Sequence, residues 1–246
     1  TEVGDLNTAR FGHASLGHTS TSAFAIGGSS AASGSAAIVE QWDGSSWTEI
    51  ADINSGRAYF GGSGLTTAGL VFGGNPENGY TESWDGSSWT EVGDMNTDER
   101  YGMGSGTQGT NTDALGFGGG YPTVTVNTES WNGSSWTEVA DLNTSRVSIG
   151  SAGVSNTSIL AFGGDVGSGT RQQALTEQWN GSGWTEVGDL NDARFVGHGA
   201  GTVTSALFFG GYNFSPNVTG NTEVWNGSAW TEVNNLNTAR YNHGGA

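Results

Sequence analysis

Short apolar runs recur along the chain, each ending at a Gly pair and each separated from the next by polar, Gly-rich segments. A short continuous apolar run bounded by Gly is typical of a strand that is buried on both faces. No segment shows a helical period with caps, so we predict an all-β chain with essentially no α-helix. The five predicted strands are Ala23–Ile26, Leu70–Phe72, Ala114–Phe117, Ile159–Phe162 and Ala206–Phe209.

Tryptophan marks a second element with the same period. All ten Trp form five pairs, and each pair brackets a four-residue insert: DGSS, DGSS, NGSS, NGSG or NGSA. Asp-Gly or Asn-Gly between strand-like runs predicts a hairpin, because both residues tolerate positive φ. If the insert is the whole loop, the two Trp of a pair face each other across the hairpin, which we favour over the diagonal placement of a two-residue loop. The pairs are Trp42/Trp47, Trp84/Trp89, Trp131/Trp136, Trp179/Trp184 and Trp225/Trp230.

Each repeat contains four extended segments: a Gly-rich segment, the apolar run, a segment ending on the first Trp, and a segment starting at the second. Sheets that are apolar on both sides need neighbours on both sides, and a ring of sheets supplies them. We therefore predict one domain, 1–246, that forms a five-bladed β-propeller of four-stranded antiparallel blades. Its Gly-rich segments would lie at the axis and its Trp segments at the rim. The approximate repeats are 10–53, 57–95, 100–142, 146–190 and 194–236, with overlapping terminal pieces 1–9 and 237–246.

The same motif occurs near both ends, as TEVGDLNTAR at 1–10 and TEVNNLNTAR at 231–240. A closed five-fold ring has room for one of these copies on its outer strand. We therefore expect one blade to be completed by strands from both termini, with the redundant copy loosely placed. The alternative is that the chain is a segment of a longer array with six or seven blades.

An Arg and a Glu also recur once in every repeat. The planar Arg side chain binds a carboxylate in bidentate fashion, so we expect an Arg–Glu ion pair within a blade or between neighbouring blades. The residues are Arg10, Arg57, Arg100, Arg146 and Arg194, with a further copy at Arg240, and Glu40, Glu82, Glu129, Glu177 and Glu223.

These motifs resemble the Kelch-repeat family of β-propellers, including Kelch-like arrays of environmental and phage origin. The resemblance rests on Arg57 before the innermost strand, Gly73-Gly74 after the apolar strand, Trp84 at the end of the third segment and Trp89 at the start of the fourth. The chain departs from the family in having Trp for the usual Tyr and a shorter aromatic spacing. Kelch-like copper-radical oxidases similar to galactose oxidase need a Cys, and this chain has none.

The charge narrows the classes of partner. The net charge is −17 and Lys is absent, which argues against nucleic acid and anionic membrane surfaces as partners. No apolar run approaches the roughly 20 residues of a membrane span. The predicted axial segments carry almost no carboxylates, so we expect no catalytic residue, no cofactor and no metal site. A carboxylate-rich, Lys-free surface suits a salty medium, and we place the protein outside cells or on a virion surface as a hypothesis.

The connections after the Gly pairs differ in length and composition between repeats. Rigid scaffolds carry recognition on such loops, which gather on one face of a propeller. We therefore predict a monomeric, non-enzymatic module that binds a protein or glycan through this face. The alternatives are a multivalent lectin with five equivalent sites, a glycoside hydrolase, and loops that serve only as linkers. The candidate ligand contacts are Tyr80, Tyr121, Arg171, Tyr212 and Phe214.

Overall fold

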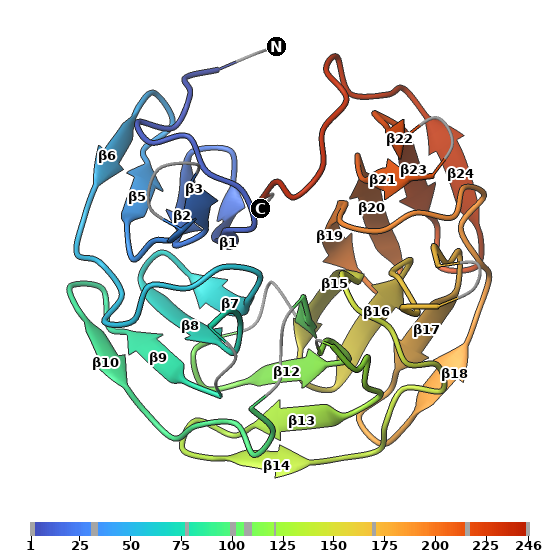
Figure 1. Cartoon of the computed structure of the whole chain (residues 1–246), viewed down its shortest axis with the longest axis horizontal. Coiled ribbons are helices and arrows are strands. Elements are labelled where there is room, and N and C mark those ends of the chain that lie inside the picture. Colours follow the sequence, from blue (N-terminus) through green and yellow to red (C-terminus); the bar gives the residue numbers. More distant parts are fainter. Residues whose placement is uncertain are drawn as a thin grey trace.

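The computed structural model describes residues 3–30, 34–76, 79–98, 102–105, 110–120, 122–168, 171–214 and 217–244. Their strands form five antiparallel sheets of four strands each, arranged around a central axis (Figure 1). The described residues contain no helix. The prediction of an all-β, five-bladed β-propeller is therefore confirmed.

Each blade takes its four strands from one repeat, in sequence order from the axis to the rim. Figure 1 shows the Gly-rich first strands near the centre and the Trp-bearing fourth strands on the outside. Two short hairpins, β3–β4 (Ser29–Ser30, Gly34–Ser35) and β21–β22 (Tyr212–Asn213, Asn217–Val218), extend the loops of the first and last blades. The blade strands are β1 (Ala14–Thr19), β2 (Ser22–Ile26), β5 (Val39–Trp42) and β6 (Trp47–Glu49) in blade 1; β7 (Gly61–Leu65), β8 (Ala68–Phe72), β9 (Thr81–Trp84) and β10 (Trp89–Glu91) in blade 2; β11 (Gly104–Ser105), β12 (Ala114–Phe117), β13 (Thr128–Trp131) and β14 (Trp136–Glu138) in blade 3; β15 (Gly150–Ser155), β16 (Ser158–Phe162), β17 (Thr176–Trp179) and β18 (Trp184–Glu186) in blade 4; and β19 (His198–Thr202), β20 (Ser205–Phe209), β23 (Thr222–Trp225) and β24 (Trp230–Val233) in blade 5.

The two Trp of every pair face each other across the outer hairpin, as expected for a four-residue loop. In blade 1, the ring centroids of Trp42 and Trp47 lie 5.5 Å apart. The turn between them is held by Asp43, whose Oδ1 accepts hydrogen bonds from the amides of Ser45 and Ser46, both at 2.8 Å. These bonds fix the turn from within, since an Asp or Asn side chain can replace a backbone acceptor.

Neighbouring blades pack through a repeated contact between Phe and Trp. Phe162, on the second strand of blade 4, lies against Trp230, on the outer strand of blade 5, with ring centroids 4.9 Å apart. The indole N–H of Trp230 also donates to the hydroxyl of Thr176 in blade 4, at 3.0 Å. Such aromatic contacts contribute about 0.5–1.5 kcal/mol beyond the area they bury. The same contact joins blades 2 and 3 as Phe72–Trp136 and blades 3 and 4 as Phe117–Trp184.

A buried ion pair fixes blades 1, 2, 4 and 5 to the linkers that precede them. The guanidinium of Arg146 bonds to Glu177 at 2.7 Å, and both side chains are almost fully buried. Burial lowers the pKa of Arg146, and the charge of Glu177 opposes that shift. Asn143 of the linker donates two further hydrogen bonds to Glu177, each 2.8 Å long. The pair lies within one repeat, between a blade and the linker that precedes it. It recurs as Arg10–Glu40, Arg57–Glu82 and Arg194–Glu223, while Arg100 lies outside the described residues.

The expected completion of a blade by strands from both termini is wrong. Each sheet consists of strands from one repeat, and in the described residues no strand precedes β1 or follows β24. Because β6 and β24 already occupy the outer edges of their blades, residues 3–10 run as a linker. The carbonyl of Gly4 accepts from Trp47 Nε1 at 3.1 Å, and the Asn7 amide donates to Glu40 at 2.7 Å.

Candidate functional site

A closed circle of backbone hydrogen bonds surrounds the axis. The residue two positions after each repeat Arg donates its N–H to the carbonyl of the same position in the preceding repeat, at 2.6–3.2 Å. All of these residues have positive φ, between 52° and 62°. For a β-branched residue such as Val196 this conformation is strained, and such strain gathers at functional sites. The members of the circle are Gly12, Tyr59, Gly102, Ser148, Val196 and Asn242.

This circle borders a cavity of about 700 Å³ on the face that carries the loops after the Gly pairs. Tyr59, Ser148, Val196 and Asn242 line it from the circle. The rest of its wall comes from the loops that follow the Gly pairs and from the residues next to the circle, Val147, Phe195 and Tyr241. The lining residues from these loops are Asn75, Gly120, Pro122, Val124, Asp165, Gly167, Arg171 and Tyr212.

Aromatic rings gather where blade 5 meets the cavity. The ring of Tyr212 lies 5.6 Å from that of Phe195, 5.5 Å from that of Phe214 and 5.9 Å from that of Tyr241. Phe214 and Tyr241 are each nearly half exposed. Their exposed faces therefore offer apolar surface to a bound molecule, while the Tyr hydroxyls offer hydrogen bonds.

A polar pair stands beside these rings. Arg171 binds Asp165 through two hydrogen bonds, from Nη2 at 2.6 Å and from Nε at 3.2 Å. Asp165 is buried and also accepts from the Gly167 amide at 2.7 Å, whereas half of the Arg171 side chain is exposed. The guanidinium lies over the ring of Phe214, 5.6 Å from its centroid. The pair uses two of the five N–H donors of Arg171, so the remaining donors can reach a ligand.

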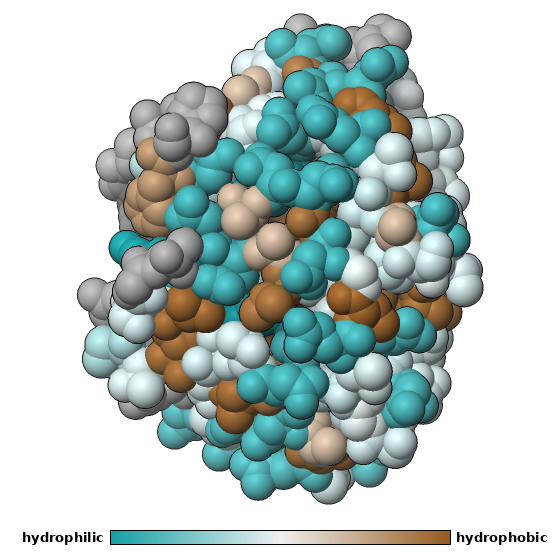
Figure 2. All heavy atoms as spheres, turned by 90° about the vertical axis from the view of Figure 1, so that its right-hand side faces the viewer, coloured by the Kyte–Doolittle hydropathy of each residue, from teal (hydrophilic) through white to brown (hydrophobic). Residues whose placement is uncertain are grey.

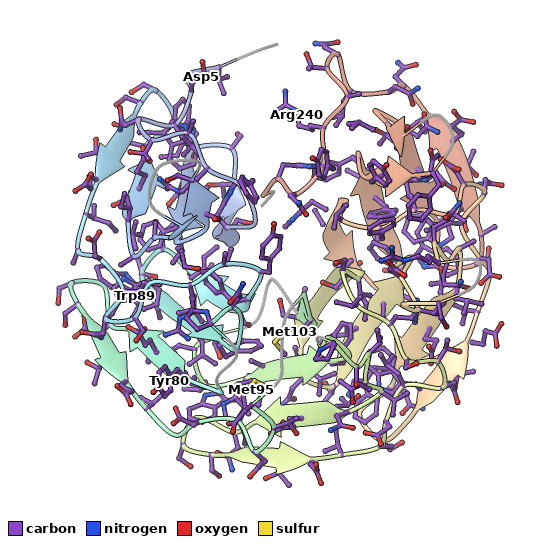
Figure 3. All side chains as sticks on the ribbon, viewed as in Figure 1. Asp5, Tyr80, Trp89, Met95, Met103 and Arg240 are labelled. Atoms are coloured by element: carbon purple, nitrogen blue, oxygen red, sulfur yellow. The ribbon has the colours of Figure 1, made fainter. Side chains whose placement is uncertain are left out.

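The structure brings together three of the five residues predicted as ligand contacts. Arg171 and Tyr212 line the cavity, and Phe214 touches both. Tyr80 is exposed but lies away from the axis, between blades 2 and 3 (Figure 3). Its carbonyl accepts a hydrogen bond from Arg57 at 2.6 Å. Tyr121 lies outside the described residues.

Three aromatic residues of the site were not anticipated from the sequence. Tyr59, Phe195 and Tyr241 line the cavity, and each follows a repeat Arg by one or two positions. The sequence carries one signal for them. They place aromatic side chains one or two positions after a repeat Arg, where the fourth repeat has Val147 and Ser148.

Below the circle, apolar side chains narrow the axial channel. Met103 lies near the centre of Figure 3, and the remaining spaces measure about 110 and 100 Å³. Between the first and last blades, the rings of His198 and His243 lie 6.3 Å apart, and the charge of His198 acts on His13. Burial, together with nearby positive charge, lowers the pKa of His13 to about 4 and that of His243 to about 3, so both are neutral near pH 7.

No group of three or more His, Cys, Asp or Glu among the described residues is arranged to hold a metal ion.

No protein-family model matches the sequence, and neither does any curated protein. Within the described residues, no helix has the length and apolar character needed to cross a bilayer. The fold alone is compatible with many functions, so the functional argument rests on the axial cavity and its side chains.

Proposed function

We propose that the protein is a non-enzymatic recognition module that binds one ligand in the axial cavity. The observation that carries this proposal is the convergence of varied residues from separate repeats on a single cavity of about 700 Å³. Sites for small ligands commonly measure about 300–1,000 Å³ and combine apolar walls with a few polar groups. The likeness of the repeats to Kelch motifs supports the same class of function.

The side chains of the cavity suit a short glycan. A sugar ring has C–H faces that pack on aromatic rings, and its hydroxyls bond to planar polar groups. Tyr212 and Tyr241 supply rings, Arg171 supplies N–H donors, and the amides of Asn75 and Asn242 supply both donors and acceptors.

Three observations weigh against the alternatives. Asp165 is the single carboxylate among the described residues that line the cavity, and it is bound to Arg171, whereas glycosidases generally use two carboxyl groups. The lining residues also differ between repeats, whereas a five-site lectin would use repeated ones. On the side of the ring that Figure 2 shows, apolar residues lie in separate small patches on a largely hydrophilic surface, which offers no broad apolar rim site.

A glycan array probed with the labelled chain tests this proposal, followed by calorimetry on the glycans that bind. We expect one site per chain, and we expect Tyr212→Ala and Arg171→Ala each to weaken binding at least about tenfold, as removal of a central contact does. Tyr80→Ala, an exposed aromatic remote from the cavity, is the matched control and should leave affinity unchanged. Five sites per chain, cleavage of a bound glycan, or an array without binding would each contradict the proposal.

A further inference from the structure

We infer that the ring has a sixth blade position, between blade 5 and blade 1, and that a sixth four-stranded repeat of the same kind fits it. The inference concerns the architecture and is independent of the ligand proposed above. It rests on four observations: the hydrogen-bond circle, the exposed face of blade 5, the exposed face of blade 1, and Arg240.

The hydrogen-bond circle has six places. Five of its residues precede a blade, whereas Asn242 precedes no strand in the described residues. Asn242 nevertheless donates to Val196 and accepts from Gly12, both at 2.9 Å, and has the same positive φ as the others. The five blades are therefore spaced around the axis as in a ring with six blade positions.

Blade 5 exposes the face that every earlier blade buries. Leu207 is 40% exposed, although the equivalent Leu160 of blade 4 is 0% exposed. Phe209 is half-buried, whereas the equivalent Phe162 is fully buried against Trp230 of the next blade. Among the described residues, no Trp packs on Phe209. This face therefore lacks the neighbour that the contact between blades requires.

Blade 1 exposes the complementary face. Trp47 is half-buried, although the equivalent Trp230 is 5% exposed. Its indole N–H bonds to the Gly4 carbonyl of the linker, as that of Trp89 bonds to the equivalent Ala51 carbonyl, so the exposure of the Trp47 ring and not this bond marks the uncovered face. An open cavity of about 560 Å³ lies along this face, lined in part by Leu6, Ala23, Trp42 and Trp47.

Arg240 occupies the position of a repeat Arg without its ion pair. It is exposed, and its guanidinium group makes a long hydrogen bond, 3.5 Å, from Nε to the Thr238 carbonyl. The other described repeat Arg residues bind a Glu on the third strand of the blade that follows them. Arg240 and Asp5 lie on opposite sides of the gap in the ring (Figure 3), where a cavity of about 460 Å³ separates the two segments.

One sheet of this repeat type satisfies all of these groups together. Its outer strand carries a Trp that can pack on Phe209, and its second strand carries an apolar residue that can pack on Trp47. Its third strand carries a Glu that can bind Arg240. Each of these contacts already exists at the other seams, and Figure 1 shows the open sector between the two faces. The sixth position is therefore continuous with an interface that the fold already uses.

The test extends the chain with a copy of residues 199–233 joined after Gly244, which stands where His198 stands in blade 5. We expect this extended chain to remain a monomer and to melt at least about 5 °C above the 246-residue chain, because both exposed faces become buried. The matched control carries the same added residues in scrambled order and should show no increase. An extended chain that melts no higher than the scrambled one would overturn the inference.

A second measurement compares two equivalent substitutions in both chains. Phe162→Ala removes a fully buried ring and should lower the melting temperature by about 6–15 °C in either chain. Phe209→Ala should lower it by less than about 3 °C in the 246-residue chain and by as much as Phe162→Ala in the extended chain. An equal, small effect of Phe209→Ala in both chains would contradict a sixth blade. So would a dimer of the 246-residue chain that Phe209→Glu dissociates, since a second copy would then cover these faces.

Discussion

Replacing Arg146 by Lys tests whether the geometry of the buried ion pair, beyond its charge, stabilises the blade. Arg146 donates to the carbonyls of Gly163 and Leu175 and to Glu177, at 2.8, 2.9 and 2.7 Å. A Lys ammonium keeps the charge but is a single point, so it cannot reach all three acceptors. Losing two hydrogen bonds of a charged group lowers the free energy of unfolding by about 3 kcal/mol or more. We expect a loss of about 3 kcal/mol, because repacking around the Lys side chain relieves part of the effect.

For a domain of this size, a loss of that order lowers the melting temperature by roughly 6–12 °C. Thermal melts followed by circular dichroism at pH 7 measure it directly. The matched control is Arg171→Lys, since Arg171 also binds a carboxylate but is half exposed. An exposed ion pair contributes about 0.2–1 kcal/mol, so this variant should lower the melting temperature by less than about 4 °C. Arg146→Lys melting no lower than Arg171→Lys would refute the argument that the buried guanidinium fork matters.

Three further results are expected. The melting temperature should fall as the pH drops from 6.5 toward 3, because the unfolded state then binds more protons than the folded state at His13 and His243, whose pKa values are lowered to about 4 and about 3. The lowered pKa of His13 alone corresponds to a loss of roughly 3 kcal/mol in the free energy of unfolding over this range. The melting temperature of His243→Ile should depend less steeply on pH than that of the wild type, because one of the two titrating groups is removed. Asp43→Asn should leave the melting temperature within about 2 °C, because Asn132 makes the same two turn bonds in blade 3, and Asp43→Ala should melt lower than Asp43→Asn. Gly44→Ala should melt at least about 2 °C lower, because φ is 97° at that position, and an unchanged melt would contradict the importance of the turn geometry.

The sequence predicts the fold well because its signals are local and repeated. Asp43 and Gly44 fix the hairpin that sets Trp42 against Trp47, and the same turn chemistry recurs in every repeat. Burial on both faces was predicted for every apolar run, and it fails at Leu207 in blade 5. That failure has a physical reason: the second face of a strand is covered by another repeat, which the local pattern does not report.

The candidate site is less predictable, because its residues meet only when the ring forms. The connections after the Gly pairs differ between repeats, and this variation indicated Arg171 and Tyr212, which line the cavity. Tyr59 and Phe195 belong to segments that appear small and Gly-rich in the sequence, and their convergence depends on positive φ at the hydrogen-bond circle. Tyr80 follows a Gly pair in the same way but lies away from the axis.

The circle around the axis is built from peptide groups alone, and this separates the shape of the cavity floor from its chemistry. Gly, Tyr, Ser, Val and Asn all occupy the circle in this one chain, and the hydrogen bonds persist with each of them. A single codon change at a circle position that lines the cavity, such as Ser148 or Asn242, would alter what the floor offers to a bound molecule, while the same backbone hydrogen bonds hold the polypeptide path. Descendants of this scaffold could therefore exchange one specificity for another in small steps while inheriting the same rigid hub.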